Sequence, residues 1–478
     1  MTGETSRALV VGFAVTGQAA ARELSSRGHH VIAVDDGEAS AESDRVAAEI
    51  GVELVWRPSK ARLAELAARV ELVVLSPGVP PSHPIFSAAE ASRIVSEIEL
   101  AFSLTERAVV AITGTNGKTT VTSLVTEILR FDGKGAEAVG NIGRPFIEAV
   151  GSDDAEVFVV EVSSFQLAWT RTFRPAVACW LNLAEDHLDW HADLEEYAGA
   201  KARIWANQAG SDVAVVNADD PVVMRWAATA PAGVLSFGRD ADVTERGGRI
   251  VAPAGEICAV SDLPRSLPHD IANACAASAA AVAAGASLAA CREGLRKGVR
   301  MPHRIELVGE GDGIRWYDDS KATTPSAVLA ALAGFDSVVL IAGGRNKGLD
   351  LGAIVRGLES ESRSGGSGLG RLRGVVAIGE SAAEVAASFG GAAGVEVRRA
   401  GSMTEAVEVA RGLATAGDAV LLSPGCASFD WYRNYGERGD DFVRVVRRLL
   451  DTSTSSIHEQ VAGGDRSDPG HLQRGGIR

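Results

Sequence analysis

The sequence lacks an excess of positive charge. Its 47 Lys and Arg residues are outnumbered by 62 Asp and Glu, which leaves a formal net charge of −15. Proteins that bind nucleic acid through a broad surface usually carry a basic patch, so we expect no nucleic-acid partner. Small anionic ligands are still compatible with this charge, because they respond to local backbone dipoles and to a few lysines.

Cysteine is scarce, and long hydrophobic runs are missing. The five cysteines neither have the spacing of metal ligands nor pair evenly, which favours free thiols buried in a reducing cytosol over a redox or zinc site. The first residues, MTGETSRALVVG, contain no long apolar core and no cleavage signal, so we expect a cytoplasmic location. The most membrane-like stretch, 271–290, is mostly alanine and indicates a closely packed soluble helix rather than a membrane partner.

What the sequence does contain is a repeated alternation of apolar strand-like runs with helix-period segments. This alternation predicts parallel sheets covered by helices, and 478 residues suffice for about three such domains. The predicted fold class is therefore α/β, with three consecutive Rossmann-like domains and a central phosphate-loop ATPase domain. We place the domains at 1–107, 108–301 and 302–451, followed by a disordered tail at 452–478. Gly/Ser-rich residues 359–373 predict a surface loop in the third domain.

The segment AITGTNGKTT, residues 111–120, resembles a shortened phosphate-binding loop. It follows a strand-like run and opens a helix whose apolar residues repeat with helical period. Its glycines let backbone amides turn toward phosphate oxygens, Lys118 supplies a positive charge, and Thr119 can ligate magnesium. The loop residues predicted to bind ATP are Gly114, Thr115, Asn116, Gly117, Lys118, Thr119 and Thr120.

Two further polar residues, Glu161 and His187, each lie just beyond an apolar strand-like run. In a parallel sheet they would reach the same edge as the loop. Either residue alone could be a solvated surface side chain, but beside a phosphate loop they are candidate magnesium ligands. Histidine is an unusual magnesium ligand, which hints at a second metal site. Lys201 lies one helix further on and, from composition alone, would be an exposed helix lysine.

The beginning of the chain, VVGFAVTG, is similar to a dinucleotide-binding fingerprint, with Asp35 near the end of the second strand-like run. Ala14, however, occupies a position where a dinucleotide site needs glycine. A UDP site would use the same features, with Thr16 and Gly17 at a helix N-terminus for the diphosphate and Asp35 for uracil or ribose. We favour UDP over NAD because nothing downstream offers a hydride-transfer site.

Seven motifs follow one another along the chain: GTNGKTT, EVSSFQL, LNLAEDHLDWH, AKARIW, MPHRIE, DDSKATTP and LLSPGCASFDWYRNYGERGDDF. In this order they resemble the Mur ligase family from about Val10 to Leu450, and DDSKATTP and SPGCASFD resemble its D-glutamate-adding branch. The resemblance implies an ATP-dependent ligase of peptidoglycan-precursor synthesis. It would activate the carboxylate of UDP-N-acetylmuramoyl-L-alanine as an acyl phosphate and join it to D-glutamate. We expect this enzyme to act as a monomer.

The same resemblance implies roles for individual residues. Catalytic roles fall to Lys118, His187 and Lys201, and Lys201 would be carbamylated. Two magnesium sites would be held by Thr119, Glu161, His187 and Lys201. Contacts to adenine, γ-phosphate and ribose of ATP would come from Asn273, Arg304 and Asp319. The UDP substrate would be contacted by Thr16, Gly17, Asp35, Ser76, Asn141 and His187. D-glutamate would be contacted by Lys321, Thr323, Lys347, Ser428 and Tyr435.

The chain departs from the family pattern at three places. His269-Asp270 stands where His-Asn is common, Tyr435 replaces a phenylalanine, and Asp35-Asp36-Gly37 replaces Asp-Thr-Arg. The last change removes a cation expected near the uracil.

Two alternatives stay open at this point. A folylpoly-γ-glutamate synthetase-like ligase shares the loop but needs no UDP domain before it. A non-catalytic, nucleotide-switched UDP-sugar binder would need no pocket for an amine acceptor.

Overall fold

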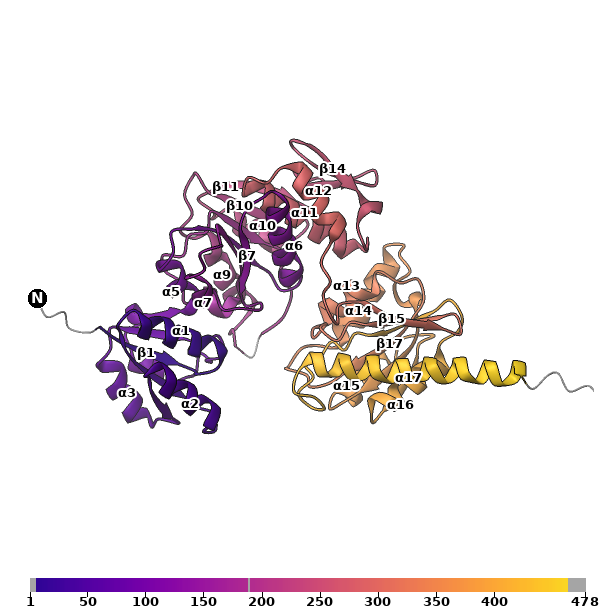
Figure 1. Cartoon of the computed structure of the whole chain (residues 1–478). Coiled ribbons are helices and arrows are strands. Elements are labelled where there is room, and N and C mark those ends of the chain that lie inside the picture. The colour runs from indigo at the N-terminus through magenta and orange to yellow at the C-terminus, as the bar shows by residue number, and fades with distance from the viewer. Residues whose placement is uncertain (1–5, 188–189, 463–478) are drawn as a thin grey trace, which may run out of the picture. The chain divides into compact units, whose positions relative to one another are not determined.

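The structure is a computed structural model that describes residues 6–187 and 190–462, with only the helical backbone described for 452–462. The described residues form two compact units that separate between Arg300 and Met301. Each unit is built from mostly parallel sheets covered by helices (Figure 1). The predicted α/β class is confirmed, and each unit is described by itself below.

The first unit begins with a five-stranded sheet of order β3-β2-β1-β4-β5, in which every neighbouring pair is parallel. Its central strands are buried on both faces because helices connect each strand to the next. The strands are β1 (Arg7–Val11), β2 (His30–Asp35), β3 (Glu53–Trp56), β4 (Leu72–Leu75) and β5 (Ile94–Ser96). The helices are α1 (Val15–Ser26), α2 (Ala41–Ile50), α3 (Lys60–Ala68), α4 (Ile85–Ala88) and α5 (Glu97–Ser103).

A six-stranded parallel sheet follows in the same unit, with order β11-β10-β9-β6-β8-β7. Its strands are β6 (Ala108–Thr113), β7 (Ala136–Gly140), β8 (Val157–Glu161), β9 (Val177–Trp180), β10 (Val213–Asn217) and β11 (Gly233–Phe237). The helices are α6 (Lys118–Phe131), α7 (Phe146–Ala149), α8 (Ser164–Leu167), α9 (Leu194–Ala202), α10 (Pro221–Ala227), α11 (Pro268–Ala283) and α12 (Leu288–Lys297). A small antiparallel sheet contains β12 (Thr244–Arg246), β13 (Arg249–Ala252) and β14 (Gly255–Ala259). The apolar residues predicted to share one face of the loop helix are all buried in α6.

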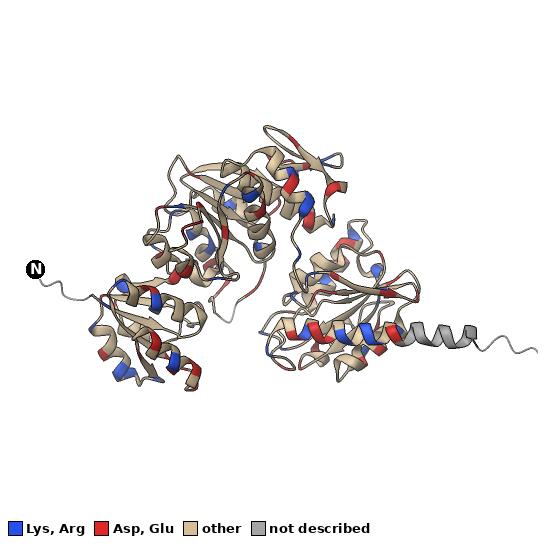
Figure 2. Cartoon of the chain, viewed as in Figure 1, with Lys and Arg blue, Asp and Glu red and all other residues tan. Residues whose placement is uncertain are grey.

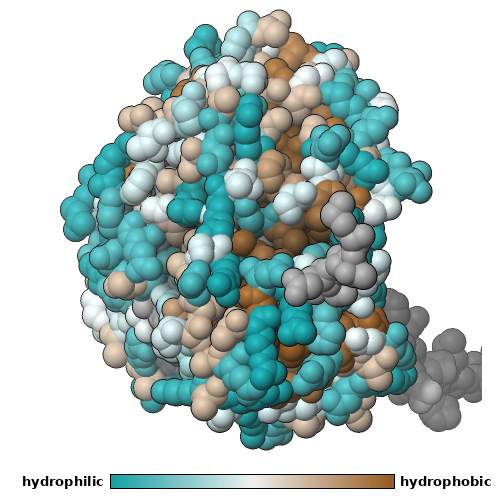
Figure 3. Space-filling view, turned by 90° about the vertical axis from the view of Figure 1, so that its left-hand side faces the viewer, coloured by the Kyte–Doolittle hydropathy of each residue, from teal (hydrophilic) through white to brown (hydrophobic). Residues whose placement is uncertain are grey.

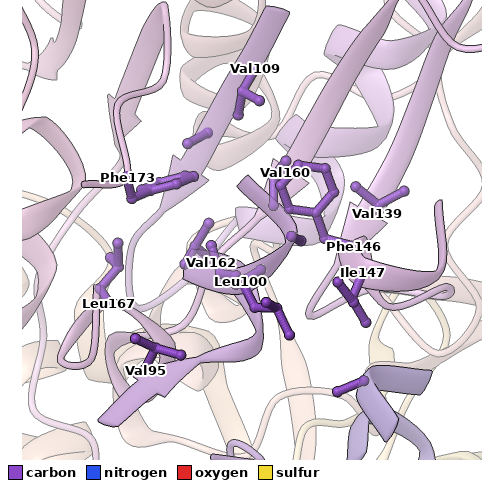
Figure 4. Close-up of a cluster of buried hydrophobic side chains, with 14 of the residues drawn as sticks. Val95, Leu100, Val109, Val139, Phe146, Ile147, Val160, Val162, Leu167 and Phe173 are labelled. Atoms are coloured by element: carbon purple, nitrogen blue, oxygen red, sulfur yellow. The ribbon is translucent and has the colours of Figure 1, made fainter. Parts of the chain in front are cut away.

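The two sheets of the first unit share a hydrophobic core. Figure 4 shows Val95 of β5 and Leu100 of α5 in the same cluster as Phe146 of α7 and Phe173. The carboxylate of Glu99 strengthens this junction, because it accepts hydrogen bonds from the amides of residues 171–173 and from the Thr172 hydroxyl, at 2.7–3.0 Å. The N-terminal sheet is thus held against the second sheet by both apolar packing and buried hydrogen bonds.

The second unit has one six-stranded sheet of order β15-β16-β20-β17-β18-β19, antiparallel only between β15 and β16. Its strands are β15 (Glu306–Gly311), β16 (Ile314–Asp318), β17 (Val338–Gly343), β18 (Leu372–Ile378), β19 (Glu396–Ala400) and β20 (Ala419–Leu422). Its helices are α13 (Pro325–Leu332), α14 (Gly352–Arg363), α15 (Ala382–Phe389), α16 (Met403–Leu413) and α17 (Tyr435–Ala462). Helix α13 begins at Pro325, where the missing amide donor of proline costs nothing.

The segment 359–373 is more ordered than its composition predicts. Helix α14 continues to Arg363, a 3-10 turn covers Gly368–Arg371, and β18 begins at Leu372. The reason is Arg371, which is buried and donates to the carbonyls of Leu332 and Phe335 at 2.8 and 2.9 Å. The predicted loop is therefore confined to the short connection between α14 and this turn.

The C-terminal end of the chain also differs from the expectation of a disordered tail from 452. Helix α17 is helical as far as Ala462, so it extends into that segment. The remaining residues, 463–478, lie outside the described part of the chain.

Charged residues of both signs lie interspersed along the helices (Figure 2). Hydrophilic residues cover much of the face drawn in Figure 3. Among the described residues, no helix combines the length and the apolar character needed to cross a bilayer. The alanine-rich segment 271–290 is not one helix, because α11 ends at Ala283 and α12 starts at Leu288, with Gly285 between them at a φ of 83°.

The five cysteines are free and buried, as the sequence predicts. Burial raises the pKa of the Cys258 thiol to about 11, so this side chain stays protonated at neutral pH. The cysteines therefore act as small apolar groups of the core.

The buried carboxyl of Glu97 generates a first prediction. It lies between α5 and α7, where Oε1 accepts from the Ile147 amide at 2.6 Å and Oε2 has no partner among the described residues. Burial raises the pKa of Glu97 to about 7, so stability from the protonated form is complete below pH 4.5 and is lost as pH rises through 7. Glu97→Gln should stabilise the protein by about 3 kcal/mol at pH 8 and leave it unchanged at about pH 4.

Thermal unfolding of both proteins at the two pH values measures this effect. Glu99→Gln is the control, because its amide nitrogen would face donors, and it should lower the unfolding temperature at both pH values. Equal unfolding temperatures for Glu97→Gln and the parent protein at pH 8 would contradict the assignment.

Candidate active site

The phosphate loop lies between β6 and α6, at the carboxyl edge of the second sheet. Gly117 precedes the helix with a φ of 85°, and a Cβ there would lie 2.6 Å from Asn273 Oδ1. Gly114 has a φ of 155°, and a Cβ there would lie 2.9 Å from the Leu181 Cβ. Both glycines are therefore required by the backbone and by close neighbours, and Gly117 leaves the N-terminus of α6 without a side-chain cap.

The loop is held in shape by Asn182, a residue that the sequence analysis did not single out. Its Oδ1 accepts from the amides of Thr115 and Asn116 at 3.0 and 2.8 Å, and its Nδ2 donates to the Asn116 carbonyl at 3.1 Å. Asn182 lies just beyond β9, inside the motif LNLAEDH. A polar residue at the end of a parallel strand could have been predicted to lie near the loop, and this was the only sequence feature that pointed to it. Tyr197 adds a second support, because its hydroxyl lies 3.2 Å from Thr115 Oγ1.

Lys118 and Lys201 converge on the same backbone carbonyl. The Nζ atoms of both lysines lie 2.9 Å from the Gly114 oxygen, and Lys118 also donates to the Thr115 carbonyl at 2.9 Å. Lys201 is buried in α9, and its ammonium lies 4.6 Å from the centre of the Tyr197 ring. Lys201 is thus not the exposed helix lysine that composition alone would suggest.

The electrostatic surroundings of Lys201 favour a neutral amine. Burial lowers the pKa of Lys201 well below its ordinary value, and the positive charge of Lys118 lowers it further. Asp186 and Glu161 act in the opposite direction on this pKa, which places both carboxylates near the amine. The structure therefore brings Lys118 and Lys201 together at Gly114, with Glu161 within electrostatic reach of Lys201.

Glu161 ends β8 and is buried. Its Oε1 accepts from Asn141 Nδ2 at 2.8 Å, whereas Oε2 has no hydrogen-bond partner among the described residues. A buried carboxylate oxygen without a donor is costly unless a cation approaches it, and magnesium is usually held by one or two carboxylates together with substrate phosphates. Glu161 therefore fits a magnesium ligand, although the described residues contain no group of three or more His, Cys, Asp or Glu side chains arranged around a metal.

His187 lies close to Tyr197, with the two ring centres 6.2 Å apart. Its backbone has a φ of 56°, and its Nε2 lies 3.3 Å from Asp186 Oδ2. Its ring packs edge-on against Phe165, with the ring centres 4.6 Å apart. These contacts hold the imidazole without burying it, and about a third of its side chain is exposed.

A cleft of about 540 Å³ opens at the carboxyl edge of the N-terminal sheet. Four of the residues predicted to bind the UDP substrate line it: Thr16, Asp35, Ser76 and Asn141. Gly17 does not line the cleft; a Cβ there would lie 1.8 Å from the Gly12 carbonyl, so this glycine permits close packing of α1. Because Asn141 also holds Glu161, the cleft reaches the edge of the phosphate-loop site.

In the second unit, Asp319 is almost completely buried beyond the end of β16. Its Oδ2 accepts from the Ser423 hydroxyl at 2.8 Å, and its Oδ1 has no partner among the described residues. Burial raises the pKa of Asp319 to about 7, and the nearby charge of Arg304 partly offsets this shift. The predicted ATP contacts Arg304 and Asp319 are thus neighbours, with one carboxyl oxygen available to a hydroxyl donor.

The five residues predicted to bind D-glutamate occupy adjoining segments of the second unit. The Lys321 ammonium lies 5.7 Å from the Tyr435 ring centre, and the Lys347 ammonium lies 5.6 Å from that of Phe429. Backbone hydrogen bonds between Arg345 and Ala427 join the segment of Lys347 to that of Ser428. Thr323 is partly exposed just before α13.

Arg438 is the residue of the second unit that the sequence analysis missed. It is buried and donates to Ser320 Oγ, to the Ser320 carbonyl and to the Cys426 carbonyl at 2.8–3.1 Å. These bonds fix the positions of the residues immediately before Lys321 and shortly before Ser428. Burial lowers the pKa of Arg438 to about 10, which still leaves it charged at neutral pH.

Family models match three consecutive parts of the chain. Residues 6–96 match the model described as Mur ligase MurD-like, N-terminal domain. Residues 112–281 match Mur ligase middle domain, and residues 303–426 match Mur ligase, glutamate ligase domain.

Curated relatives are similar over nearly the whole chain. The UDP-N-acetylmuramoylalanine--D-glutamate ligase of Pelobacter propionicus is 39% identical over 453 residues, which cover 93% of this chain and 99% of the relative. The protein of the same name from Frankia casuarinae is 41% identical over 455 residues, which cover 92% of this chain and 93% of the relative.

Solved structures share the fold at lower identity. The UDP-N-acetylmuramate-alanine ligase MurC of Thermotoga maritima superposes with a TM-score of 0.58 at 18% identity and covers 93% of this chain and 99% of its own. MurF of Acinetobacter baumannii gives a TM-score of 0.59 at 17% identity and covers 93% of this chain and 94% of its own.

Asn182 generates the second prediction. Asn182→Ala removes the acceptor of two loop amides, so we expect ATP to bind about tenfold more weakly because the loop loses its fixed shape. Calorimetric titration of ATP into the two proteins measures the change.

Asn207→Ala serves as the matched control, because the Asn207 side chain also bonds backbone groups, here two carbonyls, but lies away from the loop. This variant should lower the unfolding temperature without weakening the binding of ATP. Unchanged ATP affinity in Asn182→Ala would show that the loop keeps its shape by other means.

Proposed function

The chain belongs to the Mur ligase family, and from this premise we propose that it joins D-glutamate to UDP-N-acetylmuramoyl-L-alanine at the expense of ATP. The observation that carries the proposal is the full-length similarity, near 40% identity, to relatives named for this activity. The arrangement of the chain's own side chains supports it. The reaction belongs to the synthesis of peptidoglycan precursors.

The carboxylate of the UDP substrate must first become electrophilic. A carboxylate is a poor acceptor for an amine until one of its oxygens can leave, and phosphoryl transfer from ATP makes it a leaving group. Transfer between two anions is mainly a problem of charge and alignment. The loop before α6 and the Lys118 ammonium bind the phosphates of ATP, while Asn141, which lines the cleft of the N-terminal sheet, orients the substrate.

Magnesium, when bound, supplies the positive charge that screens the phosphate oxygens during transfer. Glu161 would hold it through the buried oxygen that lacks a donor, with Thr119 at the start of α6 as a second ligand. His187 and a carbamylated Lys201 would hold a second ion.

Carbamylation of Lys201 is supported by the surroundings of its amine. Only a neutral amine reacts with carbon dioxide, and burial together with Lys118 disfavours the charged form of Lys201. The product is a carboxylate, which the positive charge of Lys118 would stabilise. Lys201 would thus change from a cation into an anionic metal ligand.

The second unit would bind the amine nucleophile. D-glutamate carries two carboxylates, whose desolvation requires cations and hydroxyls, and Lys321, Lys347 and Ser428 provide these groups. Arg304 would contact the γ-phosphate, and the available oxygen of Asp319 would accept a ribose hydroxyl. Asn273, close to Gly117, would contact the adenine.

The two alternative functions are less well supported. A folylpoly-γ-glutamate synthetase-like ligase does not account for the match of residues 6–96 to a MurD-like N-terminal domain. A nucleotide-switched binder does not account for the match of residues 303–426 to a glutamate ligase domain. We further propose that the enzyme acts in the cytoplasm, as a monomer.

Phosphate release from ATP tests the proposed reaction. The purified full chain, with magnesium and UDP-N-acetylmuramoyl-L-alanine, should release phosphate when D-glutamate is added and remain silent with L-glutamate. Stimulation by L-glutamate and a folate instead, or ATP hydrolysis indifferent to both substrates, would refute the proposal.

Lys201 generates a third prediction. Lys201→Ala should lose D-glutamate-dependent phosphate release by at least about a hundredfold and regain part of it with added acetate or propionate, since these carboxylates can occupy the vacated position. Lys60→Ala, which removes an exposed lysine from the start of α3, should retain full activity. Loss without any recovery would refute the carbamate while leaving the ligase reaction intact.

A further inference from the structure

His187 has a backbone conformation that needs support from its neighbours. Its φ of 56° lies in the left-handed region, which is unfavourable for a residue with a side chain and persists only where surrounding contacts enforce it. Part of this support is local, because the amides of Trp190 and His191 both donate to the His187 carbonyl, at 3.0 and 2.9 Å. We call these three residues the His187 turn.

Aromatic side chains hold the His187 turn against the second sheet. The ring centre of Phe165, in α8, lies 4.6 Å from that of His187 and 4.9 Å from that of Trp190. The His191 ring lies 4.4 Å from that of Trp190, and its Nε2 lies 2.9 Å from the hydroxyl oxygen of Ser164. Both His191 and Ser164 are buried. A shift of Trp190 therefore reaches the His187 ring, because both rings pack against Phe165.

Trp190 also joins the His187 turn to the N-terminal sheet. Its indole N–H donates to the Val79 carbonyl at 3.3 Å, which links residues 111 positions apart in the chain. Val79 closes the turn after β4, where its amide donates to the Ser76 carbonyl at 3.1 Å. The Ser76 hydroxyl donates to the Gly12 carbonyl at 2.8 Å, just beyond β1. Trp190 is thus anchored to a turn that is itself fixed to the end of β1.

The turn from Ser76 to Val79 also forms part of the wall of the cleft. Both residues line the cleft of about 540 Å³, whereas Trp190 and Phe165 do not. Trp190 and Phe165 instead line a hollow of about 10 Å³ together with Ser76 and Val79. This hollow has room for about one water molecule, so the aromatic side chains pack closely on the wall. A ligand in the cleft therefore contacts the turn directly, and Trp190 contacts the same turn outside the cleft.

We propose that Trp190 is a positioning residue, which transmits the effect of a nucleotide diphosphate in the cleft to His187. The ligand fixes the turn from Ser76 to Val79, the Val79 carbonyl fixes the indole, and the indole fixes the imidazole through Phe165. The unfavourable backbone conformation of His187 is thus enforced most strongly when the cleft is filled. This inference rests on the proposed use of a UDP-linked substrate and on the proposed role of His187.

The reaction of His187 with diethyl pyrocarbonate tests how firmly the imidazole is held. The rate is measured on the full chain at one fixed pH, by mass spectrometry of the peptide that contains His187. The ligand is UDP, which fills the cleft but lacks the muramoyl group that would cover the reacting centre. UDP should slow the modification of His187 in the parent protein at least about threefold, because a ring held in place is less often accessible. His30, which is exposed at the start of β2, is the internal control and should react at the same rate.

Two substitutions at Trp190 separate the hydrogen bond from the packing. Trp190→Phe keeps a ring beside Phe165 but loses the N–H donor, so UDP should no longer change the modification rate of His187. Its D-glutamate-dependent phosphate release should fall about fivefold at saturating substrates, with an unchanged KM for ATP. Trp190→Gln loses the ring but carries an amide N–H as many bonds from Cβ as the indole N–H, so part of the UDP effect should return.

Trp56→Phe is the matched control for the loss of an indole donor. The Trp56 N–H donates to Asp44 at 2.8 Å, and neither residue lines the cleft. This variant should retain both the UDP effect on His187 and the rate of phosphate release.

Three results would contradict the inference: no binding of UDP in calorimetric titration, equal modification rates of His187 with and without UDP in the parent protein, or a UDP effect that persists in Trp190→Phe. The last result would show that UDP shields His187 directly. A UDP effect on His187 without D-glutamate-dependent phosphate release would refute the proposed reaction alone. Ligation without a UDP effect on His187 would refute the role of Trp190 alone.

Discussion

The candidate active site depends on the convergence of two lysine side chains on one carbonyl, that of Gly114. Two ammonium groups at this distance from a shared acceptor repel each other, and one of them, Lys201, is also cut off from water. The repulsion and the burial together oppose its protonation. Everything that gives Lys201 a chemical role beyond that of an ordinary cation follows from this arrangement.

That arrangement is in turn built by the backbone around it. Gly114 adopts a conformation that side chains rarely allow, and Asn182 holds the following amides from across the sheet edge. Tyr197 then closes the space between the loop and α9. Neighbouring side chains thus hold the short loop in shape.

Much of the fold could be predicted from the sequence, because the alternation of apolar runs and helical periods is strong. The loop before α6 and the strand end at Glu161 were both predicted correctly. The ordered part of 359–373 was not, because it depends on Arg371 satisfying carbonyls from another helix. The composition of a segment does not predict hydrogen bonds to residues that are distant in the sequence.

In the candidate site, too, some residues could be predicted from the sequence and others could not. Residues whose chemistry is visible in a motif, such as Lys118 and Glu161, could be proposed from the sequence. Asn182 and Arg438 could not, since their roles arise from hydrogen bonds to segments far away in the chain. Gly17 also makes room for the Gly12 carbonyl, which its motif did not reveal.

Asn141 gives the first unit one further property. Its amide holds the Glu161 carboxylate, and the same residue lines the cleft that extends to Asp36. A molecule in the cleft that turned the Asn141 amide would remove a hydrogen-bond donor from the Glu161 carboxylate. A cation bound to Glu161 would in turn shift Asn141 and so change the wall of the cleft. Thermodynamic linkage requires the coupling to be reciprocal. A ligand in the cleft would change the binding free energy of a cation at Glu161 by the same amount as the cation changes that of the ligand.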